Sequence, residues 1–246
     1  MRWPAEAVWE AVAPLLPGFT VEVLPELDST NSELMRRARA GRTEPVLLVA
    51  EHQTAGRGRL GRSWESAAGD SLTFSLGLPL APPDWSGLSL AVGVAVAEAL
   101  HADIRLKWPN DLWVDDRKLT GILIETAAPV DGGASRYTIV GIGINVAPRA
   151  APAIGLRELQ PDATAPGTLL AVAEPVVRTL QAFEQFGFSP FQARFERRDA
   201  LADRAVRLSD GMAGTAHGVD ERGALLVHTA AGMRAVTSAE VSVRPA

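Results

Sequence analysis

The stretch that decides the fold class is residues 104–125, which read IRLKWPNDLWVDDRKLTGILIE. Apolar and polar residues alternate along it, and two polar segments, Pro109-Asn110-Asp111 and Asp115-Asp116-Arg117-Lys118, interrupt the alternation. Alternation with a period of two is the pattern of a half-buried strand, and clusters of Pro, Asn and Asp mark turns. We therefore predict three strands, at 104–108, 112–114 and 119–125, and a fourth at 137–146 after a turn at Asp131-Gly132-Gly133.

Helices and further strands surround this stretch. The same periodicity rules predict strands at 21–24, 46–50 and 71–78, and helices at 3–16, 30–40, 86–101, 168–186 and 190–201. Thr30 and Glu33 form a capping box at the start of the second helix, and Ser86 is expected to cap the third. Because residues 104–146 hold strand after strand without a crossover helix, we predict an α+β domain over residues 1–203. Its sheet should be largely antiparallel and covered on one side by helices, unlike a parallel doubly wound sheet.

The composition changes near residue 204. Short apolar runs follow at 206–208, 214–219, 225–228 and 233–236, and Asp-Gly, Arg-Gly and Ala-Gly pairs separate them. Short strands divided by such turns are typical of small barrels. We predict a second domain at 204–246, a small all-β barrel.

The composition of the whole chain excludes several classes of protein. With 246 residues, 47% of them hydrophobic and 22% charged, the chain can bury a real core, which excludes a disordered or fibrous protein. Its formal net charge of -5 argues against nucleic-acid binding through bulk positive charge. The absence of cysteine excludes disulfides, Cys-ligated metals and thiol nucleophiles. No apolar run reaches the ~18 residues that span a bilayer, and Glu6 and Glu10 interrupt any signal-peptide core, so we expect a cytoplasmic protein.

A Gly- and Arg-rich segment, Gly56-Arg57-Gly58-Arg59-Leu60-Gly61-Arg62, follows the predicted strand at 46–50. It satisfies the dinucleotide-binding spacing G-x-G-x-x-G, but that motif should open an apolar helix, and here Arg62-Ser63-Trp64-Glu65-Ser66 and an alternating strand follow. We interpret the segment instead as a mobile clamp whose guanidinium groups close on phosphate or carboxylate oxygens. The alternative is a solvated basic loop. Trp64, beside the clamp, is either a core residue or a plane for a purine base.

Lys107 and Lys118 are the only lysines among the 24 Lys and Arg residues. Where nearly every cation is an arginine, a lysine indicates chemistry that needs a compact point charge. Lys107 ends a predicted strand just before the turn at Pro109. We predict that it lies in a pocket and stabilises charge on a carboxylate or an α-phosphate, the alternative being an exposed lysine without a role.

Gly141 and Gly143 lie on one face of the predicted strand at 137–146. A glycine inside a strand marks either a bulge or the close approach of a ligand or another backbone. We predict a flat ligand against this bare backbone, beside the amide of Asn145. The four histidines have no spaced carboxylate partners and no Walker A sequence is present, so we expect no protein metal site, no Ser-His-Asp triad and no P-loop.

Together, five segments resemble the motifs of the biotin–protein ligases. They are Asp28-Ser29-Thr30-Asn31 and the stretches 53–64 (QTAGRGRLGRSW), 107–111 (KWPND), 118–125 (KLTGILIE) and 141–145 (GIGIN). The match is ordered and runs over about residues 21–240, the small barrel included. The resemblance implies a main domain similar to the class II aminoacyl-tRNA synthetases, followed by an SH3-like barrel. It also implies a two-step reaction: the biotin carboxylate attacks the α-phosphate of ATP, and a lysine of a biotin carboxyl carrier domain then attacks the biotinyl-5′-AMP.

The same resemblance implies the roles of individual residues. Lys107 and Arg59 are the expected catalytic residues. Biotin is expected to contact Ser29, Thr30, Asn31, Gln53, Gly56, Arg57, Gly58, Arg59, Lys107, Gly141 and Gly143. The nucleotide is expected to contact Arg57, Arg59, Arg62, Trp64, Lys107 and Asn145. Mg²⁺ is expected to arrive with the ATP phosphates.

The expected partner is the biotin carboxyl carrier protein of a biotin-dependent carboxylase such as acetyl-CoA carboxylase. Bifunctional family members place a winged helix-turn-helix before the catalytic domain, whereas only a short helix and a strand are predicted before Asp28, so we expect no DNA binding and no repressor activity. We expect no contact with a membrane. We expect the chain to form a homodimer. Two rival interpretations remain open, a lipoate–protein ligase and a non-catalytic biotin sensor. The Gly-Arg-Gly-Arg loop favours biotin over lipoate, and Lys107 favours an enzyme over a sensor.

Overall fold

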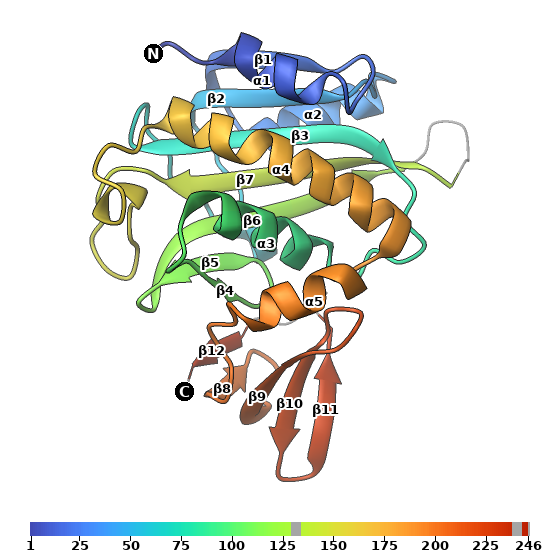
Figure 1. The fold of residues 1–246 in the computed structure, drawn as a ribbon, viewed down its shortest axis with the longest axis vertical. Coiled ribbons are helices and arrows are strands. Elements are labelled where there is room, and N and C mark those ends of the chain that lie inside the picture. The colour runs from blue at the N-terminus through green and yellow to red at the C-terminus, as the bar shows by residue number, and fades with distance from the viewer. Residues whose placement is uncertain (129–133, 238–242, 246) are drawn as a thin grey trace.

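A seven-stranded sheet forms the centre of the computed structural model, which describes residues 1–128, 134–237 and 243–245 (Figure 1). Its strands lie in the order β1-β2-β3-β7-β6-β5-β4. Their bounds are Thr20–Leu27 (β1), Val46–Gln53 (β2), Ser71–Leu80 (β3), Arg105–Lys107 (β4), Asp111–Val114 (β5), Arg117–Ala127 (β6) and Arg136–Asn145 (β7). β1 and β2 pair in parallel, and every other neighbouring pair is antiparallel. The predicted α+β class with a mostly antiparallel sheet is confirmed.

The stretch that decided the fold class folds as three consecutive strands. Val114 of β5 pairs with Arg117 of β6, which leaves Asp115 and Asp116 as a two-residue turn. Both aspartates have positive φ, 48° and 59°, as in a type I′ hairpin turn. Aspartate tolerates this conformation better than most side chains do. The turn fixes the register of β6, and a slip by one residue would move every β6 side chain to the opposite face.

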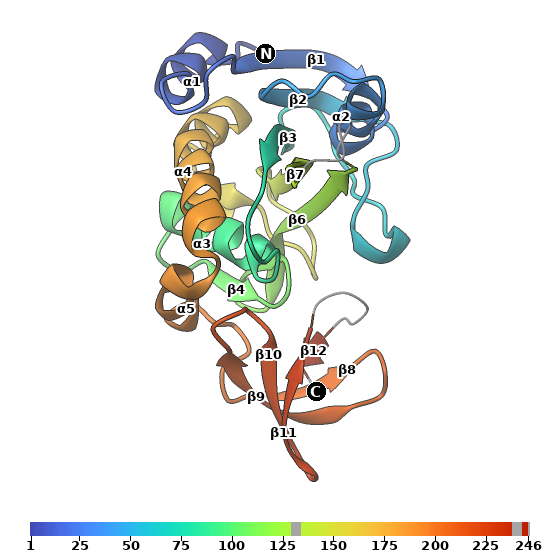
Figure 2. The same cartoon turned by 90° about the vertical axis from the view of Figure 1, so that its right-hand side faces the viewer.

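Helices cover both faces of the sheet, unequally. α1 (Ala5–Val12), α3 (Leu88–Leu100), α4 (Ala165–Phe186) and α5 (Ser189–Glu196) lie on one face, and α2 (Thr30–Arg39) lies on the other (Figure 2). The prediction of a sheet covered on one side only is therefore wrong. Leu34 of α2 is buried in a cluster with Leu48 of β2 and Ile139 of β7. Val46 to Ala50 are all buried, so this part of the sheet is apolar on both faces and needs cover on both.

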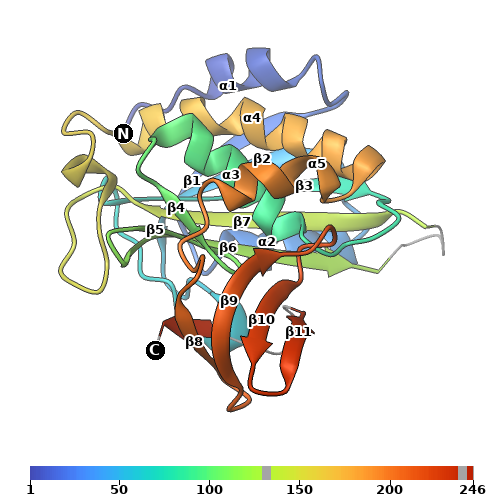
Figure 3. The ribbon, with the colours of Figure 1, turned by 60° about the horizontal axis from the view of Figure 1, so that its bottom comes forward.

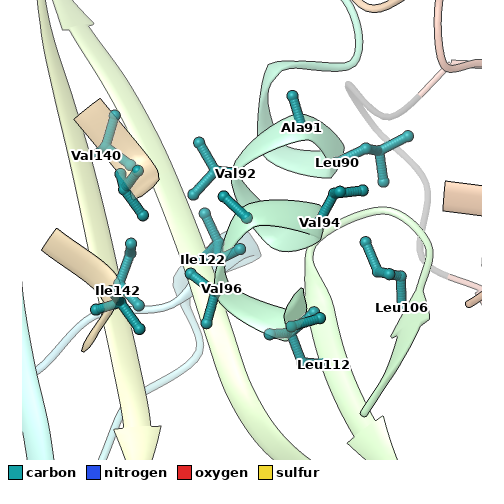
Figure 4. Packing of buried hydrophobic residues seen from close by; sticks show 14 of the residues in the cluster. Leu90, Ala91, Val92, Val94, Val96, Leu106, Leu112, Ile122, Val140 and Ile142 are labelled. Atoms are coloured by element: carbon teal, nitrogen blue, oxygen red, sulfur yellow. The ribbon is translucent and has the colours of Figure 1, made fainter. Parts of the chain in front are cut away.

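α3 fills the space between the sheet and α4. Its sequence is apolar except for Ser89 and Glu98, which is the pattern of a helix that is buried on most sides. Val92 and Val96 point toward Ile122 of β6, with Ile142 of β7 beside them (Figure 4). None of these four side chains is more than 2% exposed. This packing holds β6 and β7 rigidly from behind, and the candidate site lies on their other side.

The start of α2 differs by one residue from the predicted capping box. Ser29 is the N-cap, and its Oγ accepts a hydrogen bond from the backbone N–H of Ser32 at 3.5 Å. The Thr30 hydroxyl lies instead 3.2 Å from Gln53 Oε1 at the end of β2. A contact between distant segments thus withdraws Thr30 from its local capping role.

Two other element ends and one strand also differ from the predictions. α1 ends at Val12, and α3 begins at Leu88 after Gly87 without a cap from Ser86. Gly87 has φ of 80°, and a Cβ there would lie 2.6 Å from the ring of Phe188, so packing selects a glycine at this helix start. A three-residue strand, β12, was too short to predict from its pattern. The predicted turn at Asp131-Gly132-Gly133 lies outside the described residues.

The C-terminal residues form a second, smaller sheet below the first (Figure 3). Its strands are β8 (Ala205–Leu208), β9 (Ala213–Val219), β10 (Leu225–Thr229), β11 (Gly232–Val236) and β12 (Val243–Pro245). They lie in the order β11-β10-β9-β8-β12, and all neighbours are antiparallel. In the described part of the chain, no helix is both long and apolar enough to cross a membrane.

The two sheets meet at the strand that carries Lys107. The buried indole of Trp108, the next residue, donates a hydrogen bond from Nε1 to the carbonyl oxygen of Gly223 at 3.0 Å. The chain leading into the second sheet also runs along β4. Leu106 donates to the carbonyl of Arg198 at 2.7 Å and accepts from the N–H of Ala200 at 2.9 Å. The C-terminal part is thereby attached to the strand that carries Lys107.

We expect Trp108→Ala to lower the free energy of unfolding by about 3–5 kcal/mol, because it empties a large buried volume and leaves the Gly223 carbonyl without its donor. Urea titration at 25 °C measures this. Phe186→Ala removes a large side chain that is 64% exposed and should change the value by less than about 0.5 kcal/mol. A loss below about 1 kcal/mol for Trp108→Ala would contradict the buried joint between the sheets.

Candidate active site

A pocket with a volume of about 110 Å³ lies beside the start of α2, between the central sheet and the loop that follows β2. Residues predicted as site residues make up half of its lining: Ser29, Thr30, Asn31, Gln53, Arg57, Gly58, Arg59, Arg62, Trp64, Lys107, Gly141 and Gly143. Residues that the sequence analysis did not select complete the lining: Leu60, Ser63, Thr73, Phe74, Pro109, Asn110, Asp111, Lys118, Gly121, Ile122, Leu123 and Ile142. Segments more than 100 residues apart in sequence therefore share one cavity.

One end of the pocket is closed by buried polar groups that bond to one another. Thr30 donates from its backbone N–H to Gln53 Oε1 at 2.8 Å. Ser75 Oγ donates to Asn31 Oδ1 at 2.6 Å. Asn31 Nδ2 donates to the Leu123 carbonyl at 3.2 Å and to Glu125 at 2.9 Å. The amide of Asn31 thus has partners for both its N–H groups and its oxygen.

The two glycines of β7 are covered by the protein's own side chains. A Cβ on Gly141 would lie 2.1 Å from Asn31 Oδ1, and a Cβ on Gly143 would lie 2.4 Å from Trp64 Cε2. The sequence predicted a close approach to this backbone, and the structure has one. The groups that approach are Asn31 and the Trp64 indole, where the sequence analysis expected a flat ligand. The alternation of glycines does not encode which flat group lies on it.

The Gly- and Arg-rich loop folds back on itself. Gly58 donates to the Arg62 carbonyl at 2.7 Å, and Trp64 donates to the Gly56 carbonyl at 2.9 Å. A Cβ on Gly56 would lie 2.2 Å from the Trp64 carbonyl oxygen. Gly56 therefore shapes the loop and does not line the pocket.

Two arginines of the loop reach across to the sheet. Arg57 forms an ion pair with Glu125 of β6 and donates to Ser32 Oγ at 3.0 Å. Arg59 donates to Asn110 Oδ1 at 3.4 Å, and burial lowers the pKa of its guanidinium from the ordinary value.

Both lysines of the chain line the pocket, although the sequence analysis selected only Lys107. Lys118 Nζ lies 2.7 Å from Asp111 Oδ1 and 5.8 Å from the centroid of the Trp64 ring. Lys107 Nζ lies 5.4 Å from the centroid of the Trp113 ring. Lys118 could have been found from its rarity alone, but its strand register was needed to place it.

The ammonium of Lys107 is held in an unfavourable place. Its side chain is 8% exposed, and burial lowers its pKa from 10.5 to about 8. The carboxylate of Asp111 opposes this shift, while Lys118, Arg62 and Arg59 add to it through repulsion. The described lining holds five cationic side chains and a single carboxylate, so the pocket is built to receive anions.

Asn145 does not line the pocket. Its Nδ2 donates to the carbonyl of Lys118 at 3.2 Å and so holds the start of β6 against β7. Among the described residues, no group of three or more His, Asp or Glu side chains is placed to hold a metal ion.

Comparison with known proteins gives a consistent result. The model of the biotin/lipoate A/B protein ligase family matches residues 23–145, and that of the biotin protein ligase C-terminal domain matches residues 204–244. The bifunctional ligase/repressor BirA of Escherichia coli is 36% identical over 94% of this chain and 76% of its own length. The chain belongs to the biotin/lipoate A/B protein ligase family.

Other family members support this. The biotin–[acetyl-CoA-carboxylase] ligase of Paracoccus denitrificans is 31% identical over 89% of this chain and 98% of its own length. A structure of the Aquifex aeolicus biotin protein ligase in complex with biotin and ATP aligns with a TM-score of 0.78 and 32% identity, over 92% of this chain and 99% of the other. The predicted resemblance to the biotin–protein ligases is confirmed, and with it the prediction of an enzyme of the ligase class.

We expect Lys107→Met to raise the free energy of unfolding at pH 7 by up to about 3 kcal/mol, because the buried charge is removed. Between about pH 8 and pH 10.5 the folded wild type has released this proton while its unfolded chain still holds it. The wild type therefore gains stability relative to the variant as the pH rises through this window. Urea titrations at pH 7 and 10.5 should show the difference closing, and an equal difference at both values would contradict the buried ammonium.

Proposed function

We propose that this pocket joins biotin to ATP and that the chain then transfers biotin to a carrier protein. A biotin carboxylate oxygen attacks the α-phosphorus of ATP, a C–O–P linkage forms, and the bond to the β-phosphate breaks to release pyrophosphate. The neutral amine of a carrier lysine then attacks the acyl carbon, the bond from that carbon to the AMP oxygen breaks, AMP leaves, and the nitrogen gives up a proton to water as the amide forms. The observation that carries the proposal is the convergence of Arg57, Arg59, Arg62, Lys107 and Lys118 on one pocket of a chain from this ligase family.

The reaction needs such a cluster of cations because its two substrates repel each other. A carboxylate and a triphosphate must approach to bonding distance, and partial burial strengthens every electrostatic term between them and the protein. Cations fixed on β4 and β6 offset the repulsion without having to reorganise as charge develops. Burial, with repulsion from neighbouring cations as a smaller cause, lowers the pKa of Lys107, and a bound anion would stabilise the charged form of its side chain.

The predicted roles are kept as proposals, with changes. Ser29, Thr30 and Gln53 hold the ring system of biotin. Arg57, Gly58 and Arg59 cover the carboxylate and the phosphate, and Arg62 contacts the nucleotide.

Some predicted contacts become indirect. Asn31 and Gly56 act by shaping the site, and Asn145 supports Lys118 from outside the pocket. Gly141 and Gly143 admit Asn31 and Trp64, so that Trp64 presents the flat surface beside the nucleotide. Mg²⁺ would come with the ATP phosphates.

We propose that the loop from Gly56 to Trp64 acts as a lid in this reaction. The cavity of about 110 Å³ is smaller than the ~300 Å³ or more of typical ligand sites, which supports an outward movement of the loop as the substrates bind. On closing it would keep water from the mixed anhydride until the carrier arrives.

Further proposals concern the architecture and partners. We propose a main domain at 1–203 similar to the class II aminoacyl-tRNA synthetases and an SH3-like barrel at 204–246, supported by the small antiparallel sheet of β8 to β12. The carrier is the biotin carboxyl carrier protein of a carboxylase such as acetyl-CoA carboxylase. A cytoplasmic location and a homodimer are also proposed, the former because ATP is the second substrate.

We propose that these 246 residues do not repress transcription. The segment before Asp28 consists of α1 and β1, and β1 is paired with β2 in the central sheet. Specific retention of a biotin-operon operator by the chain in a gel shift would overturn this.

The purified chain with biotin and Mg·ATP should release about one equivalent of pyrophosphate in a burst, because the lid retains the adenylate, and should turn over when carrier is added. A pyrophosphate assay with acid-quenched chromatography of the adenylate measures both. A burst with lipoate and none with biotin would identify a lipoate ligase. Biotin binding without pyrophosphate release would identify a sensor.

We expect Lys107→Met and Lys118→Met each to slow single-turnover adenylation by about 100-fold while weakening biotin binding by less than about 10-fold. The ammonium groups act mainly on charge that develops in the transition state. Arg105→Met, which removes an exposed cation from the same strand as Lys107, should leave the rate within about twofold and serves as the matched control. A wild-type rate in either lysine variant would remove that lysine from the reaction.

A further inference from the structure

Glu125 of β6 stands between two groups of the site and was assigned no role by the sequence motifs. One carboxylate oxygen forms the ion pair with Arg57 of the loop, and the other accepts from Asn31 Nδ2 at 2.9 Å. The side chain is 24% exposed. Both oxygens are therefore engaged, one by the lid and one by the closed end of the pocket.

The hydrogen bonds continue beyond Asn31 and return to the loop. Ser75 Oγ lies 2.6 Å from Asn31 Oδ1 and 2.7 Å from Thr30 Oγ1. The Thr30 backbone N–H then donates to Gln53 Oε1 at 2.8 Å. Gln53 ends β2 and is four residues before Arg57. The contacts thus form a closed ring. The short chain segment from Gln53 to Arg57, which leads into the loop, completes it.

A ring of this kind couples its members. Hydrogen bonds in a partly buried chain polarise one another, and the loss of one charged partner leaves the next group unsatisfied. Glu125 and Arg57 are the two charged members of the ring. Their ion pair therefore attaches the lid, which carries Arg57, to the rest of the ring. Because Arg57 and Asn31 already occupy both of its oxygens, we assign Glu125 a role through these two partners and no direct contact with the substrates.

We propose that Glu125 is a positioning residue that joins closure of the arginine lid to occupancy of the ring-binding end of the pocket. It fixes Arg57 over the pocket and Asn31 against Gly141, so that a ligand touching Thr30 and Gln53 stabilises the lid through the same ring. This inference rests on the proposed function only for the identity of the ligand. The attachment of the lid to β6 is independent of it.

The first test uses no substrate. Trypsin cleaves after arginine only when the side chain can leave its partners, so the ion pair of Arg57 should protect the loop. Glu125→Gln keeps the size and one acceptor but removes the charge, and cleavage after Arg57 and Arg59 should become about 10-fold faster, because the charged partner that holds the loop is lost. Glu125→Ala should be cleaved faster still. Glu98→Gln breaks an ion pair with Arg194 far from the loop and should match the wild type.

The second test measures the coupling with biotin and Mg·ATP. Glu125→Gln should increase stray biotinylation of a bystander protein by about 10-fold and weaken biotin binding in calorimetry by about threefold, because the lid opens more often and the ring is loosened. A merely structural role would lower the amount of folded enzyme without changing the ratio of stray to carrier labelling. In an Arg57→Ala background, Glu125→Gln should add less than about twofold to either effect, because the two residues act as one unit.

The outcomes separate this inference from the proposed function. Wild-type trypsin resistance of the loop in Glu125→Gln, or full additivity with Arg57→Ala, would overturn the positioning role. If the wild type forms no biotinyl-5′-AMP, the proposed function fails, and the trypsin comparison still decides whether Glu125 anchors the loop.

Discussion

The burial of cationic side chains in a partly enclosed pocket is the constraint on which the rest of the structure depends. Lys107 is held in this environment, because β4 is packed against α3 and the neighbouring Trp108 is bonded to Gly223 of the C-terminal part. The arginines of the loop are held instead by contacts at the rim, Arg57 by Glu125 and Arg59 by Asn110. The pocket therefore combines rigid cations on strands with cations on a loop that has a defined resting place, which is the arrangement that binding and release of anions require.

Most of the fold could be predicted from the sequence, because the patterns that indicate strands and turns are local. Alternation in residues 104–125 and an Asp-Asp turn were sufficient to predict consecutive antiparallel strands. The parallel pairing of β1 with β2 was not predicted, since it depends on α2 crossing one face of the sheet and returning the chain to the end at which β1 begins. Apolar character on both faces of Val46–Ala50 indicated a buried strand but did not tell which helix covers which face.

Only part of the site could be predicted from the sequence, because local patterns do not show which distant segments come together. Residue types that are unusual in their surroundings, such as Lys107 and the loop arginines, could be found without a structure. Contacts between distant segments could not: Glu125 and Asn31 are 94 positions apart, and neither is unusual where it stands. The glycines of β7 signalled a close approach, but only the folded chain shows that Trp64 makes it.

The connection between the two sheets also covers an edge of the central sheet. β4 is the last strand of the central sheet, and its outer backbone groups are satisfied by residues 198–200 on their way to β8. A chain ended before residue 197 would keep every side chain that lines the pocket. It would also expose an unpaired strand edge next to Lys107, where a second molecule could add a strand of its own and aggregate. The segment that leads into the small sheet thus protects the central sheet from edge-to-edge aggregation and also fixes its geometry.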